Sequence, residues 1–449
     1  MTDTSFAEFI PDWQPALTHS FYLRQLLDTH PDVARWLNEH WRHPIDTATM
    51  QAFLDAAHPT DEESLRCALR QLRQRVMAAL VVRDISAQAT LSEVVEAMST
   101  LADLTTNVAL DTLHRQLATT FGEPLDKHGQ PQRLLVIGMG KLGGRELNVS
   151  SDVDYIFIYP EDGETAGSAE TRRKIEAYEF FTRLGKKLIA TLAEITGDGQ
   201  VFRVDMRLRP NGDSGPLVCS LVSLENYLIT QGREWERYAW IKARVMNAGD
   251  NQQPVWIAAL EKIVRPFIYR KYLDFGAINA MRDLHAQIRR EVARQDKADH
   301  IKLGPGGIRE IEFIAQVFQL IRGGRDGILQ IRPTLSVLPL LVDRHLLPAE
   351  SVQELIDAYH FLRRLEHRLQ YVNDAQTHML PSSETERMQI ARSMDFHDWA
   401  AFAPVLEAHR QRVAHHFEAI FSDPEEGTHA LAGLWFEQID GEDALEAVA

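Results

Sequence analysis

Residues 138–161 read GMGKLGGRELNVSSDVDYIFIYPE, and this stretch decides the fold and the chemistry expected of the chain. A glycine pair, Gly143 and Gly144, precedes two carboxylates, Asp152 and Asp154, which open an apolar run. Successive strand side chains alternate faces, so both carboxylates are expected on one face of a sheet. Two anions so close repel each other unless a cation lies between them. A hard cation such as Mg²⁺ prefers oxygen ligands and keeps positions open for phosphate oxygens. The stretch therefore predicts phosphoryl or nucleotidyl chemistry.

A second strand is predicted over residues 201–209, VFRVDMRLR, and its two faces differ in character. The apolar face carries Phe202, Val204, Met206 and Leu208. The charged face carries Arg203, Asp205, Arg207 and Arg209. One carboxylate in a row of three arginines is too much charge for a buried face that binds nothing. We therefore expect Asp205 to be a third metal ligand, with Arg207 and Arg209 neutralising phosphate oxygens.

Composition limits the class of protein. The chain has 449 residues, enough for two to four domains. Its net charge of −16 argues against long nucleic acid as a partner, because phosphate neutralisation needs a basic surface. Cys67 and Cys219 are the only cysteines, which excludes a disulfide framework and a cysteine-rich zinc site. Neither a signal peptide nor an apolar stretch of ~18 residues is visible, so we expect no membrane partner and a cytoplasmic location.

The pattern along the chain predicts an α+β protein in four segments. These are an N-terminal helical region (1–125), a nucleotidyltransferase-type catalytic core (126–223), a C-terminal helical bundle (224–425) and an acidic, linker-like tail (426–449). The core is expected to hold a small mixed sheet, with strands at 133–138, 153–159 and 201–209. An amphipathic helix is predicted over 171–196, with a face formed by Ile175, Tyr178, Phe181, Leu184, Leu188, Leu192 and Ile195. Apolar spacing predicts further helices at 21–27, 62–82, 91–117, 225–244, 276–294, 307–321, 349–373 and 399–421.

A dinucleotide-binding fold is the first alternative, since Gly138 to Gly143 match G-x-G-x-x-G after a strand. That fold needs a full helix between the glycines and the next strand. Only residues 144–151 are available, and the next strand would begin with two acids beside the pyrophosphate. The spacing therefore favours the nucleotidyltransferase interpretation.

A group of basic residues and a glycine-rich stretch each have two possible interpretations. Arg237, Lys242 and Arg244 follow the core closely, and they line a nucleotide groove or form a solvated face. The glycine-rich stretch 302–307 precedes a predicted helix, whose N-terminus attracts anions; an N-capping loop is the alternative.

A third polar group lies on the predicted helix 349–373. His360, Arg364 and His367 share a face there. Two histidines with an arginine between them are a poor metal set, so a solvated or salt-bridged face is favoured.

Four stretches together resemble the glutamine synthetase adenylyltransferase family, whose bifunctional members attach AMP to glutamine synthetase and remove it. They are GMGKLGGRELNVSSDVDYIFIYPE (138–161), RVDMRLRPNGDSGPL (203–217), REWERYAWIKARVMNAGD (233–250) and IKLGPGGIREIEFIAQVFQLIRGG (301–324). Family members carry two related nucleotidyltransferase domains, and the version with ELNVSSD and KLGPGGIRE resembles the N-terminal, adenylyl-removing one. The resemblance therefore implies the adenylyl-removing half of the family's two activities.

The resemblance implies a polymerase-β-like nucleotidyltransferase core flanked by an N-terminal and a large C-terminal all-helical region. It implies that Asp152, Asp154 and Asp205 are the catalytic, metal-binding carboxylates and that Mg²⁺ is the cofactor. The residues expected beside the nucleotide and phosphate are Lys141, Gly143, Gly144, Ser151, Arg207 and Arg209.

The implied reaction is phosphorolysis: inorganic phosphate attacks the phosphorus of AMP on a tyrosine of glutamine synthetase, giving ADP and the unmodified synthetase. Phosphate is already an anion, so no protein base is required. The expected partners are adenylylated glutamine synthetase, the uridylylated PII signal protein, inorganic phosphate, and ADP or ATP. The family is also controlled by glutamine.

Several alternatives remain open at this point. The chain transfers AMP from ATP to glutamine synthetase or another protein, or it is a non-catalytic docking module for glutamine synthetase or PII. The presence of all three carboxylates argues against a docking module. An enzyme that uridylylates PII is disfavoured because a His-Asp hydrolase pattern and sensor-type C-terminal domains are absent from the sequence. A polymerase or a tRNA-modifying enzyme is disfavoured by the net charge of −16.

Overall fold

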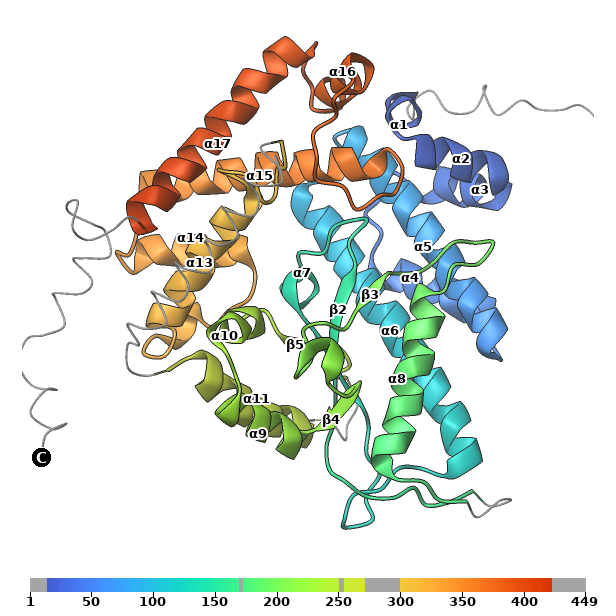
Figure 1. The fold of residues 1–449 in the computed structure, drawn as a ribbon. Helices are drawn as coiled ribbons and strands as arrows, with labels where there is room; N and C mark the ends of the chain where they lie inside the picture. Colours follow the sequence, from blue (N-terminus) through green and yellow to red (C-terminus); the bar gives the residue numbers. More distant parts are fainter. Residues whose placement is uncertain (1–13, 169–172, 250–253, 271–298, 422–449) are drawn as a thin grey trace, which may run out of the picture. The chain divides into compact units, whose positions relative to one another are not determined.

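The computed structural model describes residues 14–168, 173–249, 254–270 and 299–421 (Figure 1). Within these residues the fold is mixed α and β, mostly helical, with one small sheet. No helix among them combines the length and the apolar character that crossing a membrane requires.

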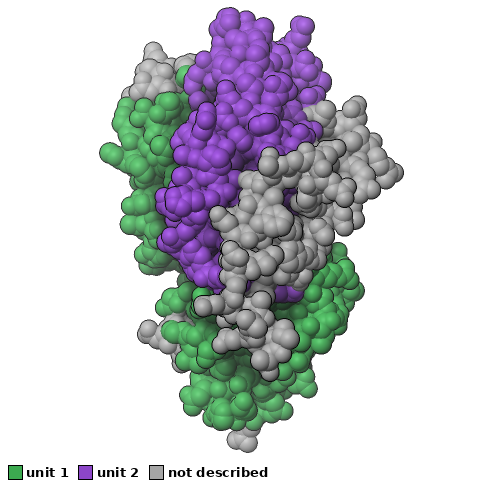
Figure 2. Space-filling view, turned by 90° about the vertical axis from the view of Figure 1, so that its left-hand side faces the viewer, with its two compact units in different colours: residues 1–269, 370–377 green, residues 270–369, 378–449 purple. Residues whose placement is uncertain are grey.

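The chain forms two compact units. Unit 1 comprises residues 1–269 and 370–377, and unit 2 comprises residues 270–369 and 378–449 (Figure 2). Helix α15 (Ala349–Tyr371) ends in unit 1, together with the residues that follow it as far as Thr377. The four segments expected from the sequence stay a prediction.

Unit 1 begins with six helices, which run from Gln14 to Phe121. They are α1 (Gln14–His19), α2 (Phe21–Thr29), α3 (Pro31–His40), α4 (Thr47–Ala57), α5 (Glu62–Ile85) and α6 (Leu91–Phe121). The helices predicted at 21–27, 62–82 and 91–117 are confirmed. Asp61 and Thr90 begin the two long helices, since their side chains accept backbone N–H groups of the first turn. The apolar side chains of these helices share one continuous core with the sheet.

The sheet contains five short strands among the described residues. They are β1 (Leu135–Gly138), β2 (Val153–Tyr159), β3 (Val204–Asp205), β4 (Val218–Ser220) and β5 (Arg244–Val245). Strand β2 pairs antiparallel with β1, and parallel with both β3 and β4; β5 pairs antiparallel with β1. The helix after β1, α7 (Gly140–Gly143), is a single turn. A dinucleotide-binding unit needs parallel neighbouring strands joined by a full helix, so that alternative is excluded.

Helix α8 (Ala177–Ala193) packs against the sheet and the long helices α5 and α6 (Figure 1). The predicted helix 171–196 was too long, and two residues of its apolar face were wrong. Tyr178 is 42% exposed, and Ile195, beyond the helix end, is 79% exposed. The neighbouring rings of Phe180 and Phe181 are both fully buried. The side of α8 that packs into the core therefore carries these two rings, and Tyr178 lies outside it.

The single helix predicted over 225–244 was also wrong. The structure has α9 (Leu221–Thr230) and α10 (Glu234–Trp240), followed by β5 and by α11 (Pro254–Ile268). The interruption lies at Gly232. A Cβ atom there would come within 2.5 Å of the Leu228 carbonyl and of the Phe267 ring, so the close approach requires glycine.

Unit 2 is helical in its described part. It contains α13 (Ile308–Arg322), the 3₁₀ turn η4 (Gly327–Leu329), α14 (Thr334–Asp343), most of α15, α16 (Glu384–Ser393) and α17 (Trp399–Phe421). The helices predicted at 307–321, 349–373 and 399–421 are confirmed, and the one predicted at 276–294 lies outside the described residues.

The glycine-rich stretch 302–307 is an N-capping loop of α13. The N–H groups of Ile308 and Arg309 donate to the carbonyls of Ile301 and Lys302, and the Gly306 N–H donates to the Glu310 carboxylate. Gly306 has φ +69°, and a Cβ atom there would lie 2.0 Å from the Arg410 carbonyl. Glycine at position 306 therefore permits a close approach between the loop before α13 and the helix α17, both in unit 2.

On α15, Arg364 pairs with Asp395 at 2.6 Å and His360 is exposed, as a salt-bridged, solvated face predicts. His367 is only 1% exposed, so its place on that face was wrong.

Candidate active site

The three predicted metal-binding carboxylates lie together where β2 and β3 begin. In the parallel pairing of these strands, Asp154 is the register partner of Asp205. Asp152 lies directly before β2, and the charge of its carboxylate, like that of Asp154, acts on the guanidinium of Arg207. All three residues are half-buried. Residues more than 50 positions apart in the sequence thus bring three carboxylates together around the guanidinium of Arg207.

The guanidinium of Arg207 is the counter-ion at this face. Its Nε donates to both carboxylate oxygens of Asp205, at 3.1 and 2.8 Å, while the side chain is 73% exposed. This bond holds the pKa of the Asp205 carboxyl below its ordinary value. Hydrogen bonding to Asp205, and more weakly the charges of Asp152 and Asp154, raise the pKa of Arg207. One exposed cation therefore lies within electrostatic reach of all three anions.

The strand predicted over 201–209 was wrong in its length, because β3 contains only Val204 and Asp205. The Asp205 carboxylate accepts the backbone N–H of Arg207 at 2.8 Å, which forms a turn in place of a longer ladder. Arg209 lies in the loop that follows. It donates to the Met206 carbonyl at 2.8 Å and is within 3.4 Å of Asp213. Arg207 and Arg209 are thus not equivalent: Arg207 faces the carboxylates, whereas Arg209 holds its own loop together.

The turn between β1 and β2 touches Asp154 through Gly140. The N–H of Met139 donates to the Asp154 carbonyl at 3.0 Å. Gly140 has φ +54°, and a Cβ atom built there would lie 3.4 Å from the Asp154 Oδ2 atom. Lys141 is half-buried on the same turn, and Ser151 is half-buried directly before the first carboxylate. The phosphate-binding roles of Lys141 and Ser151 stay predictions.

The glycine pair that we expected beside phosphate is engaged within the fold. The N–H groups of Gly143 and Gly144 donate to the carbonyls of Met139 and Gly140, both at 3.0 Å. A Cβ atom at position 143 would lie 1.6 Å from the Lys242 carbonyl oxygen, so only glycine fits there. Close packing thus accounts for Gly143, and the contact of this pair with phosphate stays a prediction.

The basic residues 237, 242 and 244 form internal contacts. Lys242 and Glu146 are both nearly buried, and their charged atoms are 2.5 Å apart. Arg237 is 2% exposed and donates to the carbonyls of Phe267 and Ile268. These contacts favour a structural role for the three residues over the alternative that they line a nucleotide-binding groove.

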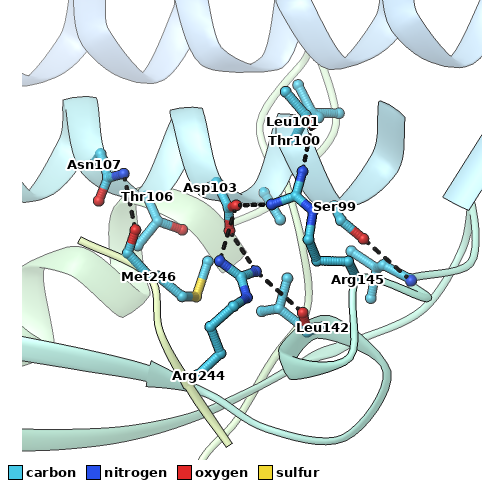
Figure 3. A network of polar contacts seen from close by, with 12 residues as sticks. Ser99, Thr100, Leu101, Asp103, Thr106, Asn107, Leu142, Arg145, Arg244 and Met246 are labelled. Carbon is cyan, nitrogen blue, oxygen red and sulfur yellow. Dashed lines mark hydrogen bonds and ion pairs between the residues drawn. The ribbon is translucent and has the colours of Figure 1, made fainter. Parts of the chain in front are cut away.

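Asp103 on α6 gathers two arginines that fix the turn containing α7 (Figure 3). It accepts Arg145 at 2.7 Å and Arg244 at 2.9 and 3.0 Å. Arg244 also donates to the Leu142 carbonyl at 3.1 Å. Figure 3 shows both guanidinium groups converging on the Asp103 carboxylate. Because Arg145 follows the glycine pair, the network anchors that turn to the helical core.

Two residues at the site were not predicted from the sequence. The side-chain amide of Gln376 donates to Asp152 Oδ1 at 2.7 Å, and Asp374 accepts the Ser150 hydroxyl at 2.5 Å. Both belong to unit 1, although they follow Asp152 by more than 200 residues. Nothing in the local pattern of VNDAQTHML distinguishes them from an ordinary loop, so only the tertiary structure identifies them.

The chemistry of the donor set suits a hard divalent cation, because three carboxylates share one face and their counter-ion is exposed. The Asp205 carboxylate accepts from the Arg207 guanidinium, and the Asp152 carboxylate accepts from the Gln376 side-chain amide. Within the described residues, no group of three His, Cys, Asp or Glu side chains is already arranged around a common centre. Burial raises the pKa of the Cys219 thiol to about 12, so this cysteine is not a thiolate nucleophile.

Comparison with known proteins shows the family to which the chain belongs. A family model described as glutamate-ammonia ligase adenylyltransferase matches residues 12–259, more than half of the chain. The chain belongs to this adenylyltransferase family. The matched residues include the three carboxylates and Arg207. A second family model, described as GlnD PII-uridylyltransferase, matches residues 282–421.

The curated relatives of the adenylyltransferase family that the chain resembles carry the name bifunctional glutamine synthetase adenylyltransferase/adenylyl-removing enzyme. The protein from Aromatoleum aromaticum is 56% identical, over 96% of this chain and 45% of its own length. The protein from Chromobacterium violaceum is 54% identical, over 93% of this chain and 46% of its own length. The protein from Neisseria meningitidis is 46% identical, over 95% of this chain and 47% of its own length. The chain thus spans about half the length of the curated relatives it matches.

Proposed function

We propose that this chain removes AMP from an adenylylated tyrosine of glutamine synthetase by metal-dependent phosphorolysis. The observation that carries the proposal is the face shared by Asp152, Asp154 and Asp205, with the exposed guanidinium of Arg207 beside them. The names of the relatives supply the substrate, since they join glutamine synthetase with adenylyl transfer and adenylyl removal. The resemblance to the N-terminal copy of the family supports removal as the direction.

Mg²⁺ is the proposed cofactor, held by Asp152, Asp154 and Asp205. When bound, such an ion neutralises phosphate oxygens and aligns the attacking and leaving groups. To serve as a ligand, Asp205 has to release Arg207. The side chain of Arg207 is exposed enough to move, and once released it is free to bind a phosphate oxygen.

The protein side chains supply position and charge in this reaction. An oxygen of inorganic phosphate forms a bond to the phosphorus of AMP, and the bond from that phosphorus to the tyrosine oxygen breaks. The proton of the hydrogen phosphate ion passes to the tyrosine oxygen, which leaves ADP and the free tyrosine. Lys141, Ser151 and Arg207 are the proposed phosphate contacts. Such transfers depend mainly on alignment and on neutralisation of charge.

The proposed partners are adenylylated glutamine synthetase and the uridylylated PII signal protein, which promotes removal in the family that the sequence resembles. The polymerase-β type of core is likewise part of the proposal. It is supported by the mixed sheet, in which Asp154 on β2 is the register partner of Asp205 on β3 and Asp152 lies directly before β2.

The decisive experiment measures ADP release from AMP-modified glutamine synthetase, with Mg²⁺ and inorganic phosphate, in the presence and absence of this chain. Phosphate-dependent ADP formation with recovery of synthetase activity is expected. AMP transfer from ATP to the unmodified synthetase, without ADP release, would reverse the assigned direction. The relatives' names include that transfer, so it is the second candidate. If neither activity appears with uridylylated PII present, the docking module is the better hypothesis.

A further inference from the structure

A segment far along the chain fixes the loop that bears the first catalytic carboxylate. Ser150, two residues before Asp152, is 1% exposed. Its N–H donates to the Gln370 side chain at 3.2 Å, and its hydroxyl donates to Asp374 at 2.5 Å. Its carbonyl accepts the guanidinium of Arg203. Every backbone and side-chain polar group of Ser150 is therefore occupied, and two of its partners come from residues 370–377.

Asp374 is itself fixed by the helical core. The Arg73 guanidinium on α5 donates to both Asp374 carboxylate oxygens, at 2.9 and 2.8 Å. Their side chains are 10% and 17% exposed, so the pair is largely shielded from water. Asp374 has φ +49°, a left-handed conformation that Asp adopts at a cost and that the surrounding contacts maintain. The carboxylate is neutralised by Arg73 and holds the Ser150 hydroxyl without adding net charge to the site.

The remainder of the segment is anchored to the N-terminal helices. The Ser20 hydroxyl donates to the Tyr371 carbonyl at 2.5 Å, and the Tyr22 N–H donates to the Val372 carbonyl at 3.0 Å. The phenol of Tyr371 donates to Asp84 at 2.7 Å. These three bonds fix Tyr371 and Val372, the residues just before Asp374, to the helices α2 and α5 and to Ser20 before α2.

Gln376 completes the arrangement at the carboxylate itself. Its amide donates to Asp152 Oδ1 at 2.7 Å, which leaves Oδ2 for another partner. A neutral amide fixes the orientation of the carboxylate without cancelling the charge that attracts a cation. Groups that hold metal ligands in this way commonly contribute ~10–100-fold to metal affinity or activity.

We propose that Asp374 and Gln376 are positioning residues of this active site: Asp374 fixes the Ser150 turn, and Gln376 orients the carboxylate of Asp152. The proposal rests on the proposed metal-dependent function and adds to it two residues supplied by the segment 370–377. Neither residue takes part in bond making. Their effect is exerted on the affinity for the cation and on the rate of the chemical step.

The test compares Ser150→Ala and Gln376→Ala with wild-type protein and with the control Gln353→Ala. Gln353 is an exposed glutamine that donates to Asp357 within unit 2. Mn²⁺ affinity is measured from the electron paramagnetic resonance signal of the free ion, which requires no turnover. We expect both site variants to bind Mn²⁺ about tenfold more weakly and to lower kcat about tenfold. We expect KM for the modified synthetase to stay as in wild type in both variants, and the control to match wild type throughout. The melting temperature should stay as in wild type for Gln376→Ala, because Gln376 is exposed, and should fall for Ser150→Ala, which removes a hydrogen bond from a buried hydroxyl to a carboxylate.

Three results would overturn the proposal. Wild-type Mn²⁺ affinity and kcat in both site variants would show that the segment does not position the carboxylate. A melting temperature of Gln376→Ala that falls in step with its activity would assign the segment 370–377 a structural role only. Wild-type protein that binds no Mn²⁺ and releases no ADP would overturn the proposed function, and this role with it. The first two results would leave the proposed function standing, provided that wild-type protein is active.

Discussion

Replacing Gly143 by alanine tests whether the glycine pair serves packing. The new Cβ atom would lie 1.6 Å from the Lys242 carbonyl oxygen and 2.5 Å from the Gly138 carbonyl oxygen, whereas real contacts of this kind stay above 3.0 Å. The Lys242 backbone would have to retreat by about 1.4 Å, from 1.6 to 3.0 Å. Lys242 is tied to Glu146 in a nearly buried ion pair, so this retreat disturbs that pair as well.

The expected cost follows from these two contributions. Overpacking a well-packed site costs ~1–3 kcal/mol, and displacing the Lys242–Glu146 pair without breaking it adds only part of the ~3–5 kcal/mol that loss of a buried ion pair costs. We expect Gly143→Ala to lower the free energy of unfolding by about 3–5 kcal/mol. For a unit of this size, the melting temperature should fall by on the order of 10 °C.

Two other glycines serve as graded controls in the same thermal-unfolding measurement. A Cβ atom at Gly144 would meet the end of the Glu146 side chain at 2.9 Å, so Gly144→Ala should cost less. Gly197 has open space and no positive φ, so Gly197→Ala should be nearly neutral. If Gly143→Ala melts like wild type while KM for phosphate rises, the packing argument is refuted and the predicted phosphate contact is favoured.

Three further predictions concern charged residues. Asp154→Asn should abolish ADP release while the circular dichroism spectrum and melting temperature stay unchanged, because the half-buried carboxylate serves the cation and not the core. Arg207→Ala should raise the pKa of Asp205 toward its ordinary value, measured by NMR titration of the carboxyl carbon. Since the folded-state pKa is the lowered one, the pair stabilises the fold at neutral pH and that contribution disappears as the pH falls through this pKa. Lys242→Met should destabilise unit 1 by ~3–5 kcal/mol, whereas the double variant with Glu146→Leu should recover most of the loss.

Each of these predictions has a contrary outcome. Near-normal turnover of Asp154→Asn would remove this residue from the metal set. An unchanged titration of Asp205 in Arg207→Ala would mean that the exposed guanidinium does not pair with the carboxylate in solution. If Lys242→Met kept full stability and lost only nucleotide affinity, a role of Lys242 in a nucleotide-binding groove would be favoured over a role in the buried ion pair.

The strands and helices were predictable where one physical signal dominated. The run 153–159 is a strand because its side chains are apolar and β-favouring, and β2 has these bounds. The same reasoning failed at 201–209, where alternation favoured a long strand. The Asp205 carboxylate captures the Arg207 N–H there and forms a turn, a local competition that the period-2 pattern does not reveal.

The acidic residues of the candidate site could be proposed from the sequence, whereas most of the contacts around them could not. Strand geometry brings Asp154 and Asp205 side by side as register partners, whereas Asp152 was assigned from its spacing and from the resemblance, and the metal-binding role of all three stays a prediction. The roles of Gly143, Lys242 and Arg244 were not recoverable in that way. A glycine that admits a carbonyl and a lysine that pairs inside the core have the same sequence signature as phosphate-binding residues.

The sequence by itself thus determined the family and the strand 153–159, because these depend on local pattern and composition; the acidic residues proposed for a nucleotidyl-transfer site rest on the same kind of signal. Only the tertiary structure decided which cation faces the carboxylates, which basic residues are internal, and that residues 370–377 reach Ser150 and Asp152. These contacts join positions more than 200 residues apart. Such pairings depend on how the whole chain packs, and no local period in the sequence encodes them.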